Sequence, residues 1–174
     1  VGKITDTELD ICYYKAAAQY AGGDIEGALA TYQAMIDYDE ENGNAYYLHG
    51  CLSLKQQDTD TAKKDFANAV KYNPDDYELY VGIYENLAGN NMTEEGEEYL
   101  NKAFDIKGNS AENLTWRGRI YYLLGQYDNA VKELEGAVKK DSAKANLYLA
   151  QVYEAEEDSA NAEKYAGRPV YTVR

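Results

Sequence analysis

Apolar and polar residues alternate along the chain with a helical period, in stretches separated by short polar turns. Apolar side chains recur every three or four positions, as at Leu29, Tyr32 and Ile36, and this spacing places them on one face of an α-helix. The turns are rich in Gly, Asn, Asp and Gln, which end one helix and cap the next. The pattern predicts helices at 7–21, 25–39, 43–56, 59–72, 76–89, 93–106, 110–124, 127–140, 143–156 and 159–167.

The stretches repeat at a constant step along the chain, which is the signature of a protein built from stacked structural units. Residues separated by this step occupy equivalent positions, which we call a column. One column contains the small residues Ala28, Ala62, Gly96 and Ala130. Another contains the bulky residues Tyr32, Phe66, Leu100 and Leu134. A fifth unit fits when the columns shift by two positions, so that Ala150 takes the place of Gly118 and Ala162 that of Ala130.

Each unit contains two predicted helices, which indicates a helical hairpin. A small residue is needed where the two helices cross closely, and a bulky one fills the space a turn later. Because one hairpin cannot bury both of its faces, it stacks on the next. We therefore expect an all-α fold, an α-α superhelix of about five helical hairpins, that forms a single domain over 1–174. The expected repeats are 9–42, 43–76, 77–110, 111–144 and 145–168, followed by a C-terminal tail at 169–174.

The sequence resembles the tetratricopeptide repeat, and in particular bacterial proteins built from it. That family's pattern is W-x2-L-G-x2-Y, then A-x3-F, then P. The fourth repeat matches it with Leu114, Gly118, Tyr121, Ala130 and Leu134. The second matches it with Tyr46, Gly50, Ala62, Phe66 and Pro74. The third repeat departs most from this family pattern, at Tyr84 and Gly96. The resemblance covers about residues 9–166 and implies a solenoid whose concave groove is lined by the first helix of each hairpin.

Charge narrows the range of partners. The 174 residues include 31 acidic and 17 basic ones, for a formal net charge of -14. This excess argues against nucleic acid, whose binding depends on Lys and Arg neutralising phosphates, and against anionic lipid surfaces. No apolar stretch approaches the ~20 residues of a membrane span. A neutral or basic protein or peptide is the partner that this charge favours.

No group of residues predicts an enzyme, a cofactor site or a metal site. His49 is the only histidine, and Cys51 lies two positions away, where side chains on a helix do not face each other. The Gly22-Gly23 turn lacks the Gly-Lys-Ser/Thr of a phosphate loop. Cys12 and Cys51 fall in first helices of neighbouring repeats, whose axes lie ~8–10 Å apart. We expect both thiols to be free, since a disulfide needs Cα atoms within ~7 Å.

The resemblance implies that the inward face of each first helix contacts a peptide. Carrying those positions over gives the main candidates Tyr13, Tyr20, Asn44, Tyr47, Lys55, Glu78, Glu85, Arg119, Tyr122 and Gln151. The other inward positions are Asp10, Ala17, Cys51, Leu54, Val81, Ala88, Glu112, Thr115, Lys144, Leu147 and Glu154. Tyr and Arg often dominate the binding energy of interfaces. A clamp for acidic chaperone tails is excluded, because Tyr13 and Ala17 replace its basic groups and Glu78 and Glu85 would repel such a tail.

The leading hypothesis is therefore a scaffold that binds a peptide or protein segment in its groove. The alternative is a self-associating solenoid, for instance a homodimer, without a peptide ligand. A solenoid needs polar units at its ends, whereas this chain ends with Tyr165, Val170, Tyr171 and Val173. The first residue is not Met, and the composition resembles exported, surface-anchored repeat proteins of gut-type bacteria. We expect an extracytoplasmic location, with the cytoplasm as the alternative.

Overall fold

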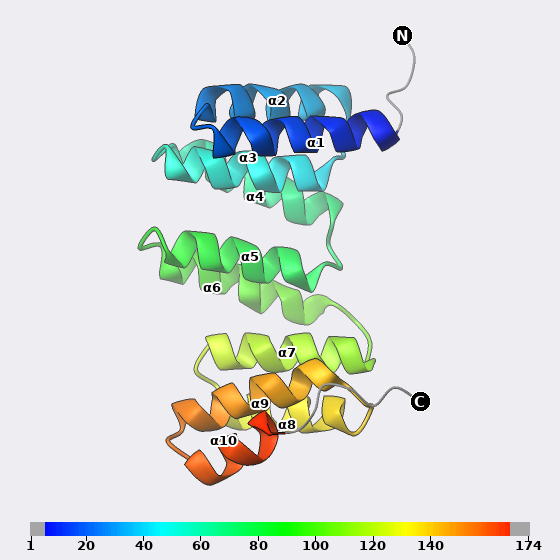
Figure 1. Cartoon of the computed structure of the whole chain (residues 1–174), viewed down its shortest axis with the longest axis vertical. Coiled ribbons are helices and arrows are strands. Elements are labelled where there is room, and N and C mark those ends of the chain that lie inside the picture. Colours follow the sequence, from blue (N-terminus) through cyan, green and yellow to red (C-terminus); the bar gives the residue numbers. More distant parts are fainter. Residues whose placement is uncertain (1–5, 168–174) are drawn as a thin grey trace. The chain divides into compact units, whose positions relative to one another are not determined.

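The structure is a computed structural model that describes residues 6–167, with side chains from Glu8 onward. Over this range the chain folds into α-helices joined by short turns (Figure 1). The helices are α1 (Asp6–Ala21), α2 (Ile25–Tyr38), α3 (Gly43–Lys55), α4 (Thr59–Tyr72), α5 (Tyr77–Ala88), α6 (Thr93–Lys102), the 3-10 helix η1 (Ala103–Asp105), α7 (Ala111–Leu123), α8 (Tyr127–Val138), α9 (Ala143–Ala155) and α10 (Ser159–Ala166). The described residues fall into two compact units, which divide between Tyr99 and Leu100.

Successive helices pair into hairpins at the predicted places. The first helices of the second, third and fourth hairpins begin at Gly43, Tyr77 and Ala111, which are equally spaced along the chain. The first helix of the fifth begins at Ala143, two positions earlier than the same step would place it. The predicted shift by two positions in the fifth repeat is therefore confirmed.

Polar side chains fix the starts of the helices. The carboxylate of Asp24 accepts a hydrogen bond from the backbone N–H of Gly27 at 2.9 Å. Asp58 does the same for Thr61 at 3.1 Å, and Asp76 for Leu79 at 3.1 Å. A capping oxygen satisfies one of the N–H groups that the first turn of a helix leaves unpaired. The polar turns thus set the helix boundaries that the sequence indicated.

The matched columns form the hydrophobic core of each hairpin. Ala28, Ala62 and Ala130 are 0% exposed, and so are Phe66 and Leu134. The opposing first helices carry glycine where they approach most closely. A Cβ added at Gly118 would lie 2.4 Å from Leu134 Cγ, and one at Gly50 would lie 3.0 Å from Phe66 Cε1. At both places a small residue faces a bulky one where the two helices cross, as the sequence predicts.

One predicted helix is wrong at its end. The stretch 93–106 was expected to be a single α-helix, but the α-helix ends at Lys102 and continues as the 3-10 turn η1. The N–H of Ile106 bonds to the carbonyl of Ala103 at 3.2 Å, and Ile106 has extended backbone (ψ 122°). Ile106 is 7% exposed. Burial of this side chain therefore accompanies the tighter last turn.

Neighbouring hairpins within each unit share apolar contacts. In the first unit, Tyr32, Met35 and Ile36 of α2 belong to one cluster with Ala45 and Leu52 of α3. In the second unit, α8 and α9 share a similar cluster. No helix within residues 6–167 is both long and apolar enough to span a membrane. The predicted tail at 169–174 lies outside the described residues, and the single domain over 1–174 stays a prediction.

Candidate functional site

Tyr13, a predicted groove residue, joins the first and second hairpins. Its hydroxyl donates to Asn42 Oδ1 at 2.8 Å, and the same oxygen accepts from the N–H of Ala45 at 3.0 Å. Asn42 is the N-cap of α3. Burial raises the pKa of the Tyr13 hydroxyl. The half-buried ring therefore positions the start of α3, and its hydroxyl is already occupied.

Tyr20 and Lys55 form an exposed contact between α1 and α3. Lys55 Nζ donates to the Tyr20 hydroxyl and lies 4.6 Å from the centre of its ring. Tyr20 is 40% exposed. A cation over a tyrosine face is stabilising, though modestly so at an exposed site. These two predicted residues are therefore brought together and remain accessible to a ligand.

Tyr47 packs between the second and third hairpins. Its hydroxyl accepts from Asn86 Nδ2 at 3.4 Å, and a Cβ added at Gly82 would lie 2.5 Å from it. The hydroxyl also shares a hydrogen bond with the thiol of Cys51. Burial raises the pKa of Tyr47. Glycine at position 82 thus makes room for this ring, which is half-buried in the core.

The remaining predicted residues of the first unit lie at the surface. Asn44, Glu78 and Glu85 are exposed. Asn44 Oδ1 accepts from Asn73 Nδ2 at 3.2 Å. Leu54 and Val81, by contrast, are 2% and 3% exposed. They are core residues rather than groove residues, because the face on which they lie packs inside the unit.

Cys51 and His49, the two side chains considered for nucleophilic chemistry, are half-buried and buried, respectively. Burial raises the pKa of the Cys51 thiol to about 11, which disfavours the reactive thiolate. His49 Nδ1 lies 2.6 Å from Asp65 Oδ2, so its ring is engaged with α4. Cys12 and Cys51 are unpaired. Within residues 6–167 no three His, Cys, Asp or Glu side chains cluster as a metal would require.

Arg119, on α7 in the second unit, lies at the centre of an aromatic cluster. Its guanidinium carbon is 5.6 Å from the ring centre of Trp116 and 5.3 Å from that of Tyr148 on α9. Arg119 Nη1 also donates to the Tyr148 hydroxyl at 2.9 Å. A guanidinium beside two aromatic rings is held by cation–π attraction and by the hydrogen bond together. The cluster is therefore a fixed feature of the surface between the first helices of the fourth and fifth hairpins.

A pocket of about 300 Å³ adjoins this cluster. Its lining consists of Ala111, Glu112, Thr115, Trp116, Ser142, Lys144 and Tyr148. The hydroxyls of Thr115 and Ser142 share a hydrogen bond at 2.7 Å and fix α7 against the start of α9. Glu112 and Lys144 are exposed and bring charges of both signs to the pocket. The space suits an apolar side chain flanked by polar groups.

Tyr122 and Gln151, the other predicted residues of this unit, are half-buried. The Tyr122 ring lies 6.0 Å from that of Tyr127 at the start of α8. Trp116 and Tyr148, which line the pocket, were not predicted. Both occupy the column that contains Tyr14 and Leu48. The signal that could have found them is the single Trp of the chain, one of the residue types enriched in binding hot spots.

Comparison with known proteins agrees with this architecture. Models of the tetratricopeptide repeat family match residues 43–76 and 117–168. Curated protein sequences give no match. Repeats of this kind typically form non-catalytic scaffolds for protein–protein interaction. The matched segments include the second hairpin and most of the fourth and fifth.

Solved structures similar to the chain are also tetratricopeptide-type proteins. The type IV pilus biogenesis factor PilW is 20% identical with a TM-score of 0.58, over 93% of this chain and 76% of PilW. TTC0263 of Thermus thermophilus is 21% identical with a TM-score of 0.54, over 90% of this chain and 87% of that one. YrrB, described as a tetratricopeptide-repeat protein with an unusual peptide-binding site, is 21% identical with a TM-score of 0.50, over 86% of this chain and 78% of YrrB. The predicted all-α solenoid fold is confirmed, and the chain is a tetratricopeptide-repeat protein.

Proposed function

We propose that this protein is an interaction scaffold that binds a peptide or protein segment, anchored at the pocket between α7 and α9. The observation that carries the proposal is Arg119 held beside Trp116 and Tyr148 at the edge of a pocket of about 300 Å³. Rigid aromatic and Arg side chains provide most of the binding energy of typical interfaces. Their ordering before the ligand arrives lowers the entropic cost of binding.

The ligand that fits is an extended segment with one apolar side chain and a neutral or basic character. The apolar side chain would enter the pocket beside Trp116, and Leu147, which is 57% exposed, would add a second apolar contact. The exposed Glu112 in the pocket lining and the net charge of -14 favour basic flanking residues. The peptide-binding site described for YrrB, at a TM-score of 0.50, supports peptides as the ligand class.

A random peptide library displayed on phage, selected against the whole chain, tests the proposal. Trp116 is the only tryptophan, so its emission reports directly on the pocket when selected peptides are titrated. We expect enriched peptides to carry an aliphatic or aromatic residue next to Lys or Arg, and to change the emission of Trp116.

Leu147→Ser is the diagnostic variant, because an exposed side chain can be changed without unfolding the hairpin. It should weaken binding at least about tenfold, the loss expected for one apolar anchor. Tyr38→Ser, at a residue 40% exposed on α2, is the matched control and should bind as the parent does. If the selected peptides bound Leu147→Ser and Tyr38→Ser equally and left the emission of Trp116 unchanged, the pocket would not be their binding site.

A further inference from the structure

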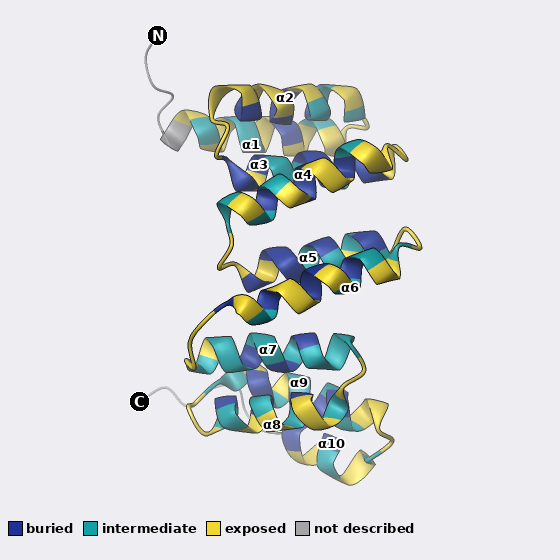
Figure 2. Cartoon of the chain, turned by 180° about the vertical axis from the view of Figure 1, so that it is seen from behind, coloured by how far each residue is buried: buried dark blue, intermediate teal, exposed yellow. Residues whose placement is uncertain are grey.

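The innermost polar groups of the pocket between α7 and α9 are the hydroxyls of Thr115 and Ser142. Thr115 is 4% exposed and Ser142 is half-buried, whereas Glu112 and Lys144, which also belong to the lining, are exposed. Glu112 is the one exposed residue of α7, and Figure 2 shows the rest of this helix buried or half-buried. The pocket therefore has its charges at the mouth and a pair of neutral hydroxyls at its floor.

The direction of the hydrogen bonds at this floor is fixed. The Thr115 hydroxyl donates to the carbonyl of Ala111 at 2.7 Å, and because a carbonyl only accepts, the single hydroxyl proton of Thr115 is used there. In the 2.7 Å contact between the two hydroxyls, Ser142 must then be the donor. Ser142 Oγ also accepts from the backbone N–H of Ala145 at 3.4 Å. The hydroxyl protons of Thr115 and Ser142 are thus both engaged within the protein.

The two floor oxygens are left as hydrogen-bond acceptors. A hydroxyl oxygen carries two lone pairs, and Ser142 takes one of those on Thr115 while Ala145 takes one of those on Ser142. The part of the chain that the structure describes brings no further donor to either oxygen. One lone pair on each oxygen therefore remains for a ligand. A ligand group that only accepts, such as a carbonyl or a carboxylate, would find no proton at the floor, and burying it there without a partner is unfavourable.

A cationic side chain also fits this floor poorly, although it would be a donor. Lys144 lies in the lining, and the Arg119 guanidinium lies beside the rings of Trp116 and Tyr148 at the edge of the pocket. Two positive charges against the one carboxylate of Glu112 oppose a third cation inside, and that cation would also lose its hydration. A neutral donor meets neither obstacle. Basic residues of the ligand are better placed outside the pocket, near Glu112.

The donors of the lining lie nearer the surface than the floor hydroxyls. They are the ammonium of Lys144, which is exposed, and the indole N–H of Trp116, which is half-buried. Both suit the carbonyl oxygens of a peptide backbone, which need donors when a segment binds in an extended form. The backbone of the ligand is therefore held at the mouth, and only its side chain reaches the floor.

The walls of the pocket suit an aromatic ring. Trp116 and Tyr148 supply aromatic surface, and Ala111 supplies a small apolar one. An apolar cavity of ~150 Å³ holds benzene, so a pocket of about 300 Å³ leaves room for a ring that bears a polar tip. Aromatic pairs are stabilised beyond the area that they bury when their rings are offset or edge-to-face. The ligand side chain that combines these features has an aromatic body and a neutral donor at its far end.

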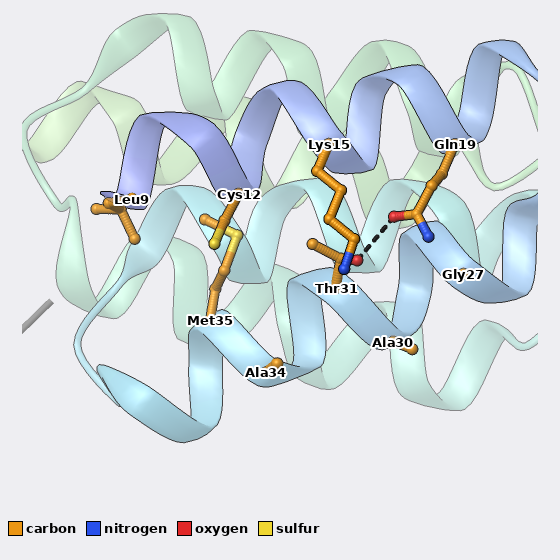
Figure 3. Close-up of a pocket in the computed structure, with 9 residues that line it drawn as sticks. All are labelled: Leu9, Cys12, Lys15, Gln19, Gly27, Ala30, Thr31, Ala34 and Met35. Atoms are coloured by element: carbon orange, nitrogen blue, oxygen red, sulfur yellow. Dashed lines mark hydrogen bonds between the residues drawn. The ribbon is translucent and has the colours of Figure 1, made fainter. Parts of the chain in front are cut away.

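A second pocket of about 300 Å³, between α1 and α2, provides a contrast (Figure 3). Its Thr31 hydroxyl donates to Gln19 Oε1 at 2.7 Å, and Figure 3 shows the Lys15 side chain extending toward Thr31. The described residues that line this pocket include no aromatic side chain. It has the same volume but a cation inside and no aromatic walls, so it serves as the internal control for the pocket between α7 and α9.

We propose that the pocket between α7 and α9 takes the phenol side chain of a tyrosine, whose hydroxyl donates to the Thr115–Ser142 pair. This inference rests on the proposed function and names the residue that anchors the ligand. Tyrosine fits better than tryptophan because its donor stands at the tip of the ring, farthest from the backbone, whereas an indole carries its N–H on the side. Phenylalanine fills the same walls but leaves the floor oxygens without a donor. Thr115 and Ser142 are therefore the residues that determine specificity.

Three capped synthetic peptides test this choice, with the sequence Gly-Lys-Xaa-Lys-Gly and either Tyr, Phe or 4-methoxyphenylalanine at Xaa. The methoxy group accepts a hydrogen bond but has no proton to donate. Each peptide is titrated at millimolar concentration into the ¹⁵N-labelled whole chain, and the indole N–H resonance of Trp116, the only tryptophan, reports on the pocket. We expect the Tyr peptide to bind about three- to tenfold more tightly than the other two, which is the gain from one neutral hydrogen bond.

Variants of the protein separate the hydroxyl pair from the walls. Thr115→Val keeps the volume, removes one acceptor and releases the Ser142 proton. The methoxy peptide should then bind better, and the ratio of its dissociation constant to that of the Tyr peptide should fall close to one. Thr115→Ser keeps the hydroxyl and should retain the preference of the parent. Ala34→Leu, at an exposed residue in the lining of the pocket between α1 and α2, fills that pocket and should change nothing.

Equal binding of the Tyr and Phe peptides, or a preference for Tyr over the methoxy peptide that survives Thr115→Val, would overturn the tyrosine anchor. A Tyr peptide that left the Trp116 resonance unmoved, or whose binding Ala34→Leu abolished, would overturn it as well. The peptides selected from the phage library judge the broader function separately. If those peptides perturb Trp116 without a tyrosine, the pocket binds peptides through another anchor. If neither set of peptides perturbs Trp116, the proposed function fails together with this inference.

Discussion

The ring of Tyr84 on α5 lies directly against the backbone of Gly96 on α6. A Cβ at Gly96 would stand 3.0 Å from Tyr84 Cδ2 and 3.3 Å from Tyr84 Cα. The second and fourth repeats have the opposite arrangement, with glycine on the first helix (Gly50, Gly118) and alanine on the second. The third repeat has thus exchanged the position of its glycine to accommodate a large ring.

This exchange predicts that the effect of Gly96→Ala on the free energy of unfolding changes sign when Tyr84 is also replaced. Gly96→Ala should destabilise the protein by about 1 kcal/mol. Crowding of the new methyl group against Tyr84 costs about 1–3 kcal/mol, whereas the higher helix propensity of Ala stabilises by about 1 kcal/mol. In a Tyr84→Gly background the same change should stabilise, since the pair then resembles Gly50 with Ala62. Urea unfolding of the four proteins measures the coupling. Gly136→Ala, whose Cβ would meet only Leu114 Cδ1 at 3.5 Å, is the control and should stabilise.

Most of the fold could be read from the sequence because the columns at the helix crossings carry strong constraints. Ala28, Ala62 and Ala130 must be small and Phe66 and Leu134 must be large, so the period and the hairpins follow. The end of α6 could not be read, since nothing in the local sequence distinguishes an α-helical from a 3-10 turn at Ala103. That choice depends on the burial of Ile106, which is a tertiary effect.

The groove was harder to predict, because an inward position on a helix can serve either a ligand or the next hairpin. Tyr13 and Tyr47 have hydroxyls bonded to Asn42 and Asn86 across hairpins, contacts between residues far apart in the chain that no local pattern reveals. Trp116 and Tyr148 were missed for the same reason. Their role becomes visible only once α7 and α9 lie side by side.

The buried pair of His49 and Asp65 gives a second prediction. The two side chains approach to 2.6 Å, and the residues are 9% and 8% exposed. Asp65→Ala leaves the imidazole without its partner, and we expect a loss of about 2–3 kcal/mol in the free energy of unfolding. The double variant His49→Leu, Asp65→Tyr copies Leu149 and Tyr165 of the fifth repeat, both buried. It should recover part of the loss in denaturant unfolding, and a double variant less stable than Asp65→Ala would contradict this account.

The cap at Asp58 should make stability depend on pH. The hydrogen bonds from the Thr61 side chain and backbone lower the pKa of this carboxyl below its ordinary value of 3.8. Its contribution is therefore complete above pH 3.8 and declines as the pH falls through the lowered value in the folded state. Asp58→Ala should lower the melting temperature at pH 7, and the difference from the parent should shrink below pH 3. Asp58→Asn retains a capping oxygen and should stay close to the parent at pH 7.

The Cys51 thiol should react slowly in the folded protein. Burial raises its pKa from 9.0 to about 11, which lowers the thiolate fraction near pH 8 by about 100-fold, a factor of ten for each pH unit. Because the thiolate is the nucleophile, alkylation by iodoacetamide should slow by a similar factor relative to the unfolded chain. The measurement uses Cys12→Ser, so that only Cys51 is modified. Equal rates with and without denaturant would show that the thiol is not held in the buried environment described.

The last prediction concerns Arg117, whose bonds join three segments of the second unit. Its Nε donates to Glu133 Oε2 on α8 at 2.9 Å, and its other nitrogens bind Gly108 and Asn109 in the loop before α7. The Arg117 and Glu133 side chains are 14% and 21% exposed. Lysine has one ammonium and cannot reach all of these acceptors. We therefore expect Arg117→Lys to cost about 2–3 kcal/mol, the range for charged hydrogen bonds that are mostly buried.

The exposed pair of Lys63 and Glu95 offers the contrast for this test. Its side chains are 49% and 45% exposed at a separation of 3.3 Å, and solvent screens such pairs strongly. Lys63→Ala should leave the melting temperature almost unchanged. Amide hydrogen exchange would separate the two variants further, because Arg117→Lys should expose the loop 107–110 and the first turn of α7. If Arg117→Lys left that exchange unaltered, the loop would be held by its own backbone rather than by Arg117.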